Sequence, residues 1–263
     1  MIVSNYELLI KRIATVPTST PASISSVFRR VVQGYFLMIT NLEEDRSISL
    51  SLKLTIPTSS GNRVMSNLNT QIFYDNGTIN NTPLSLNQLN PINANHTEYR
   101  TSSFNLGPRR TALVTILPNV IPFINSPMPD LEIRGYVELF QRRVFPRGFF
   151  TETPEAKVLV SPETRGTFLD NDYPTTSTSN ELDFDQISYG LPIASGKNLN
   201  VLESVPPILL PPPLDFNDIA TLRQSIQSKN PDLDSEELDI VTNNFFSMKG
   251  NKELEKLLKS INK

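Results

Sequence analysis

The segment from Arg46 to Ile56 constrains the fold of this chain more than any other stretch. Its apolar side chains fall on every second position from Ile48 to Ile56, and Ser, Lys and Thr fill the positions between them. Successive side chains of a β-strand point to opposite faces, so this alternation predicts a strand with one buried and one solvated face. Such strands are typical of antiparallel sheets.

Neighbouring segments extend this pattern. Val27 to Thr40 is rich in β-branched and aromatic residues, and the polar residues 41–45 that follow predict a hairpin with the strand at 46–56. Leu131 to Phe140 alternates again, with Gly135 on the buried side, which indicates a bulge or a close contact. We therefore expect a mostly β chain, with an antiparallel β-sandwich of immunoglobulin-like or fibronectin-type-III-like architecture over residues 27–204.

Asn76-Gly77 follows another strand segment, Gln71 to Tyr74. This dipeptide favours a type I′ hairpin turn, in which both central residues take positive φ.

The sequences on either side of residues 27–204 differ from the sandwich pattern. Residues 1–26 predict an N-terminal arm or an edge strand. Residues 205–214 form a Pro-rich linker, which favours a polyproline II spacer and could also be bound by an aromatic groove on a partner. In residues 215–263 the apolar period changes to that of helices. This segment predicts three short helices, with a capping box at Asp234 and Glu237.

Composition excludes several kinds of site. The chain has no cysteine, so disulfides, thiolate metal sites and cysteine nucleophiles are impossible. A net charge of −3 argues against a surface that attracts nucleic acid as a whole. No apolar run is long enough to predict a transmembrane helix, and no secretory signal is visible, which favours the cytoplasm. We expect no cofactor.

Three features of the sequence could carry chemistry: a single histidine and two acidic clusters. His96, the single histidine, has no nucleophile motif beside it, and we expect a surface histidine. Acidic residues cluster around Asp234 and Glu237, and again in the polar segment 170–185. Calcium binding is one interpretation, but acidic residues in a first helical turn already interact favourably with the helix dipole, and we expect solvated charge in the second cluster.

Arginines and phenylalanines interleave in residues 139–150. This mixture is typical of core residues rimmed by charge, of protein interfaces, and of surfaces that bind nucleic acid or another anion. Apolar residues at helical spacing near the C-terminus form a second set with an uncovered face. The candidate partner-binding residues are Arg142, Arg143, Phe145, Arg147, Phe149, Phe150, Leu238, Val241, Phe245, Leu254, Leu257 and Leu258.

Because no catalytic motif is present, we expect a non-catalytic structural or protein-interaction protein, a subunit or adaptor that binds a protein partner or itself. Two alternatives stay open. One is a calcium-assisted β-sandwich that binds glycan or a cell surface. The other is a hydrolase that uses a pair of carboxylates.

Overall fold

The computed structural model describes residues 1–12, 30–57, 65–66, 68–77, 81–89, 95–120, 130–143, 151–169, 186–209, 219–231 and 233–247. The chain divides into two compact units. The first comprises Met1–Phe140 and Lys157–Val201, and the second comprises Gln141–Ala156 and Leu202–Lys263. The domain boundaries expected from the sequence, at residues 26, 204 and 214, stay a prediction.

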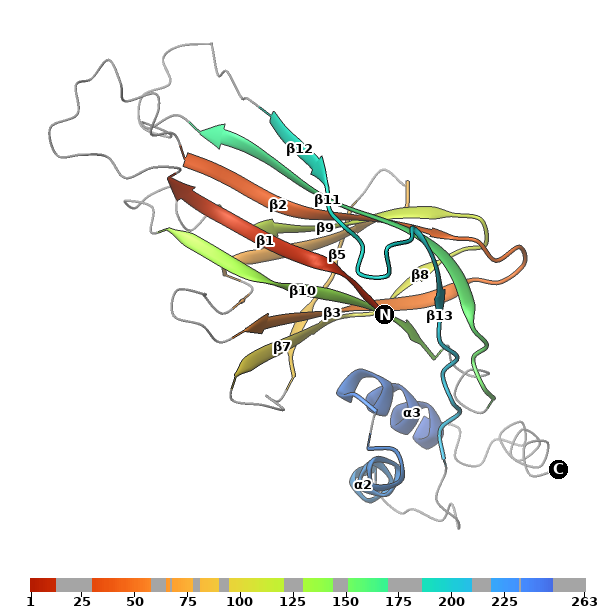
Figure 1. Cartoon of the computed structure of the whole chain (residues 1–263). Coiled ribbons are helices and arrows are strands. Elements are labelled where there is room, and N and C mark those ends of the chain that lie inside the picture. The colour runs from red at the N-terminus through yellow and green to blue at the C-terminus, as the bar shows by residue number, and fades with distance from the viewer. Residues whose placement is uncertain are drawn as a thin grey trace, which may run out of the picture. The chain divides into compact units, whose positions relative to one another are not determined.

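The described residues are mainly strands (Figure 1). The longer strands are β1 (Ile2–Arg12), β2 (Arg30–Asn41), β3 (Ile48–Pro57), β4 (Thr70–Asp75), β7 (His96–Thr101), β9 (Thr111–Pro118), β10 (Leu131–Arg142) and β11 (Ala156–Leu169). The shorter ones are β5 (Thr82–Pro83), β6 (Leu86–Gln88), β8 (Phe104–Leu106), β12 (Gln186–Gly190) and β13 (Leu199–Leu202).

These strands form one connected sheet that branches at β2. Along one edge, β2 pairs with β11 over its whole length. Along the other edge, its first residues, Arg30–Gln33, pair with β1, and Tyr35–Thr40 pair with β9. One branch continues from β1 through β10, β3, β7 and β6, and the other from β9 through β4 and β5. The expectation of a mostly β, antiparallel fold is confirmed.

The alternation at residues 46–56 produces a buried apolar face, as expected: Leu50, Leu52 and Leu54 have no exposed surface. The expectation that the opposite face is solvated is wrong, because Ser51 and Thr55 are buried as well. Their side chains are small enough to be covered by close neighbours. The missing side chain of Gly135, for example, lets β10 approach the Thr55 carbonyl.

The hairpin expected between residues 27–40 and 46–56 does not form. β2 pairs with β1, β9 and β11, whereas β3 pairs with β10, β7 and β8, so the chain passes from one branch of the sheet to the other between them. Asn41, fully buried, holds this crossing. Its amide Nδ2 donates to the carbonyl oxygens of Arg46 (2.9 Å), Leu106 (3.1 Å) and Gly107 (3.0 Å).

The type I′ turn expected at Asn76-Gly77 is also wrong. Tyr74 pairs with Thr82, so the loop is longer than a two-residue hairpin. Gly77 has a φ of 84°, but Asn76 is not among the residues with positive φ. The Asp75 carboxylate accepts a hydrogen bond from the Gly77 amide at 2.8 Å, and this local bond sets the turn.

Among its described residues the second unit contains two helices, α2 (Ile219–Lys229) and α3 (Ser235–Ser247). The third helix predicted from the sequence, after Gly250, lies outside the described residues. Asp234 caps α3, because its Oδ1 accepts from the Glu237 amide at 2.9 Å. Asn230 follows α2, and its side chain bonds to both backbone groups of Leu209. The Asn230 Oδ1 accepts from the Leu209 amide (2.7 Å), and its Nδ2 donates to the Leu209 carbonyl (2.8 Å). In the part of the chain that the structure describes, no helix is long and apolar enough to span a membrane.

Candidate functional site

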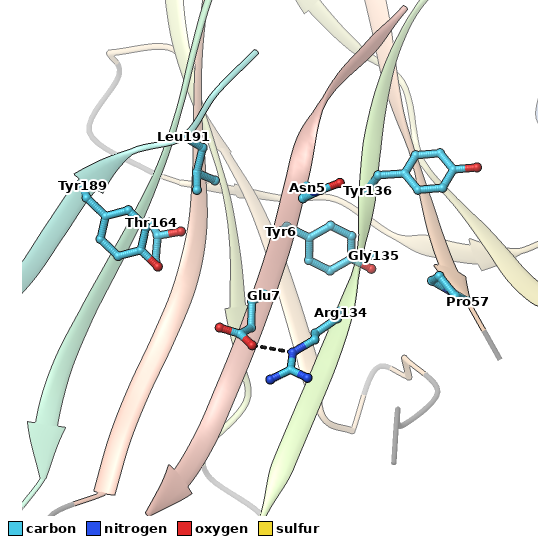
Figure 2. A pocket seen from close by; sticks show the side chains of 10 residues that line it. All are labelled: Asn5, Tyr6, Glu7, Pro57, Arg134, Gly135, Tyr136, Thr164, Tyr189 and Leu191. Carbon is cyan, nitrogen blue, oxygen red and sulfur yellow. Dashed lines mark hydrogen bonds and ion pairs between the residues drawn. The ribbon is translucent and has the colours of Figure 1, made fainter. Parts of the chain in front are cut away.

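The first unit carries an open pocket of about 440 Å³ (Figure 2). Two neighbouring strands, β1 and β10, supply most of its lining, and β11, β12, the residue after β12 and the end of β3 supply the rest. The lining residues are Asn5–Glu7, Arg134–Tyr136, Pro57, Thr164, Tyr189 and Leu191. Leu191 is held in place by its amide, which donates to the Pro162 carbonyl of β11 at 2.9 Å. We call this feature the tyrosine pocket.

Tyr6 forms the buried part of the tyrosine pocket. This residue is 2% exposed. Its ring packs edge-on against the ring of Tyr35, with 6.1 Å between the ring centres, and its hydroxyl donates to the Met65 Sδ at 4.0 Å. Burial, followed by repulsion from Tyr99, raises the pKa of Tyr6 far above its ordinary value. The phenol therefore stays protonated at neutral pH, which makes it a fixed wall and not a base.

Charged side chains of β1 and β10 form ion pairs with one another at the rim of the pocket. Glu7 and Arg134 are directly opposite in the ladder, and Arg134 Nε donates to Glu7 Oε1 at 2.5 Å. Arg134 also lies 2.6 Å from Glu132, which in turn accepts from Lys11 at 2.6 Å. The hydrogen bond from Lys11, with the charge of Arg134, holds the pKa of Glu132 below its usual range despite partial burial. The rim thus carries both signs of charge, paired within the chain.

The remaining lining groups combine aromatic surface with hydrogen-bonding groups. Tyr189 is 47% exposed and pairs with Thr164 across β11 and β12. Figure 2 shows Tyr136 on the far side of β1 from Tyr189, with Asn5 near it. Such a site can hold a ligand by ring contacts and by the Asn5 amide and tyrosine hydroxyls. Glu7 is the one carboxylate among the lining residues, and Arg134 already binds it.

Two carboxylates do come together elsewhere in the first unit, around Lys53. Its Nζ lies 2.7 Å from Glu138 and 3.1 Å from Glu98. Burial lowers the pKa of Lys53, but the hydrogen bonds to Glu138 and Glu98 outweigh it and leave the pKa raised. Lys53 therefore stays charged and joins β3 to β7 and β10. His96 lies beside this group, with its Nε2 3.7 Å from Glu98 Oε1.

Apolar side chains gather on part of the face of β9, β2, β11 and β13 that is turned away from the core. Met38 is 40% exposed and lies opposite the half-buried Leu113 of β9, and Leu159 of β11 is 42% exposed. The register places Ser161 opposite Met38 and Leu159 opposite Thr40, so Met38 and Leu159 are diagonal neighbours on one face. We call the following residues the outer apolar face: Met38, Leu113, Leu159 and, on β13, which pairs with β11, the half-exposed Leu199 and Val201.

Two of the sequence-predicted partner-binding residues, Arg142 and Arg143, are buried in the second unit. Arg142 forms an ion pair with Asp234, and Arg143 Nη1 lies 2.8 Å from Glu237 Oε2. Arg143 Nε also donates to the Pro206 carbonyl at 2.8 Å. All four charged side chains are less than one-tenth exposed. Two of the carboxylates that suggested a calcium site, Asp234 and Glu237, are thus bonded to arginines.

The other predicted residues divide into two groups. Leu238 and Val241 of α3 are buried within the second unit, together with Leu222 and Ile226 of α2. The side chain of Phe245 lies outside the described residues, as do Phe145, Arg147, Phe149, Phe150, Leu254, Leu257 and Leu258, and the acidic segment 170–185.

None of the residues that line the tyrosine pocket is among the binding residues predicted from the sequence. Glu7 and Arg134 are 127 positions apart, and only the pairing of β1 with β10 brings them together. The one usable signal was Gly135, whose place on an apolar strand face indicated a close contact. Among the described residues, no group of histidine, aspartate and glutamate side chains could hold a metal ion.

Comparison with known proteins gives little. No family model matches the chain. No curated protein matches it either. One solved structure resembles it weakly, a viral chemokine binding protein, R17, encoded by rodent gammaherpesvirus Peru. The identity is 8% and the TM-score 0.22, over 72% of this chain and 63% of that one. The chain thus spans less than two thirds of that protein, and a likeness at this level says nothing about function.

Proposed function

We propose that this chain is a non-catalytic structural protein that associates with a second copy of itself through the outer apolar face. The observation that carries the proposal is the contiguity of that face. Met38, Leu113 and Leu159 are neighbours across three strands, and half-exposed apolar residues of β13 extend the set. Contiguous exposed apolar surface of this kind marks protein interfaces, whereas apolar residues scattered singly do not.

A second copy is the occupant that this face fits. An interface around a two-fold axis places the same patch on both subunits, so an apolar face is complementary to itself. One charged pair on this side of the sheet, Glu163 with Arg165 at 2.7 Å, is formed within the chain. The Arg165 guanidinium in turn lies 4.7 Å from the ring centre of Phe36. A net charge of −3 adds little repulsion between two copies.

The architecture we propose for the body is the sandwich expected from the sequence. Its support is the branching at β2 and the contact between branches, where the Tyr74 ring of β4 lies 4.8 Å from the Phe104 ring of β8. Each sheet of a sandwich has one face turned away from the core. The outward face of β9, β2 and β11 is therefore available for packing against the same face of a second copy.

Light scattering coupled to size exclusion tests the proposal. We expect the full chain to run as a dimer at about 100 µM, where a contact with a Kd near 1 µM is saturated. The double substitution Met38→Glu and Leu159→Glu should give a monomer with an unchanged melting temperature. The matched control is Leu68→Glu, because Leu68 is 76% exposed and lies outside the outer apolar face, and this variant should stay dimeric. A wild-type monomer at this concentration, or a dimer that survives the double substitution, would overturn the proposal.

A further inference from the structure

The geometry of the tyrosine pocket points to a second binding activity: we propose that it holds an extended proline-rich peptide. This inference does not depend on self-association, because the pocket and the outer apolar face share no residue. It rests on three properties of the pocket, which are its aromatic lining, its hydrogen-bonding groups and its balanced charge.

The aromatic lining suits proline rings. Tyr6, Tyr136 and Tyr189 line the pocket from three different strands, together with Pro57 and Leu191. The exposed ring of Tyr189 and the half-buried ring of Tyr136 offer flat apolar surface at low conformational cost, since a tyrosine has few rotatable bonds. Proline-rich segments bind other proteins through aromatic-lined grooves of this composition.

The hydrogen-bonding groups suit a polyproline II backbone. This conformation makes no internal hydrogen bonds, so its carbonyl oxygens remain available as acceptors. The pocket supplies donors for them: the Asn5 amide, which is exposed, and the Tyr136 and Tyr189 hydroxyls. Proline has no amide hydrogen, so such a ligand needs few acceptors in return.

The balance of charge does not favour a strongly charged ligand. Glu7 and Arg134 neutralise each other at 2.5 Å, and Glu132 is bonded to both Arg134 and Lys11. A phosphate or a basic peptide would have to break these pairs. A neutral peptide leaves them in place, and proline-rich segments are commonly neutral. The chain itself contains one, Val-Pro-Pro-Ile-Leu-Leu-Pro-Pro-Pro-Leu at residues 205–214.

The test is a calorimetric titration of the full chain with a synthetic peptide of that sequence, blocked at both ends. The peptide is expected to bind, and the same peptide with every proline replaced by alanine is not. Tyr189→Ala should weaken binding by about tenfold or more, as loss of an aromatic anchor does at interfaces. Tyr189 is exposed, so this variant keeps the fold. Leu199→Ala, an exposed apolar residue outside the pocket, should bind like wild type.

Three outcomes would overturn the inference: no binding of the proline peptide, equal binding of the alanine peptide, or an affinity unaffected by Tyr189→Ala. Repeating the titration with the Met38→Glu, Leu159→Glu protein separates this inference from the proposed function. If the protein does not self-associate, the affinity for the peptide is unchanged. If the pocket does not bind the peptide, the oligomeric state is unchanged.

Discussion

Gly135 of β10 lies directly opposite Tyr6 of β1, and only a residue without a Cβ fits there. A Cβ at this position would lie 2.1 Å from the Thr55 carbonyl oxygen and 2.9 Å from Tyr6 Cε1. The contact on one side is backbone, which cannot rotate away. The pair therefore sets both the approach of β3 to β10 and the depth of the tyrosine pocket.

We predict that Gly135→Ala lowers the free energy of unfolding of the first unit by about 3 kcal/mol, the upper part of the range for overpacking. Urea denaturation followed by circular dichroism measures this. Gly190→Ala is the matched control, because nothing lies within 4 Å of a Cβ there, and it should change stability by less than about 0.5 kcal/mol. Equal stability of the two variants would show that β10 can move away from Thr55 at little cost.

The ion pair between Arg143 and Glu237 should be far more sensitive to substitution than an exposed one. Glu237→Gln leaves a buried guanidinium without its counter-charge, and we expect a loss of about 3–5 kcal/mol. Glu7→Gln, which removes a pair whose arginine is 60% exposed, should lose no more than about 1 kcal/mol. Chemical denaturation of both variants gives the comparison. Similar small losses would mean that the arginine reaches solvent once its partner is changed.

Asn41 should be required for the crossing between β2 and β3. Its Nδ2 donates to three carbonyl oxygens, and its Oδ1 accepts from the Glu43 amide at 3.0 Å. Asn41→Ala leaves these buried groups without partners, and we expect a loss of about 2–4 kcal/mol. Asn41→Asp keeps the shape but directs a carboxylate at carbonyl oxygens, so it should be at least as destabilising. Asn119→Ala, whose bond to the Leu68 carbonyl is exposed, serves as the control and should have a small effect.

Alkaline pH should destabilise the first unit through its buried tyrosines. Burial raises the pKa of Tyr6 and of Tyr35 well above 10, although the hydrogen bond with Ser4 partly opposes the shift at Tyr35. A raised pKa means that the contribution to stability is complete below the unfolded value near 10 and is lost as pH rises above it, because only the unfolded chain releases these protons. Each such tyrosine adds a slope of about 1.4 kcal/mol per pH unit.

Urea denaturation at several pH values above about 10 measures that slope. Tyr6→Phe removes one titrating group and should reduce the slope by about 1.4 kcal/mol per pH unit, and Tyr35→Phe should do the same. The ultraviolet absorbance of tyrosinate gives an independent check, since these two side chains should ionise only when the protein unfolds. A slope that neither substitution changes would contradict the burial of the hydroxyls.

Local patterns at residues 46–56 and 131–140 were enough to predict the strands β3 and β10, and a local cap was enough to predict the start of α3. The reason is that each depends on a short-range period or a cap: Leu50, Leu52 and Leu54 alternate within one strand, and Asp234 bonds to an amide three residues away. The prediction of a hairpin after Asn41 was wrong because a polar segment between two strands is compatible with two outcomes. The strands can pair with each other, or the chain can cross to another branch of the sheet. Bonds from Asn41 to Leu106 and Gly107, far along the chain, decide between them.

The sequence by itself determined that this chain builds an antiparallel β body followed by amphipathic helices, because side-chain period is a property of neighbouring residues. Tertiary structure alone decided where surfaces and sites lie. It buried Arg142 and Arg143 against α3, it placed Glu7 beside Arg134, and it left Met38 and Leu159 together on an exposed face. Each of these outcomes depends on which strands become neighbours, and strand pairing joins residues whose separation along the chain carries no local signal.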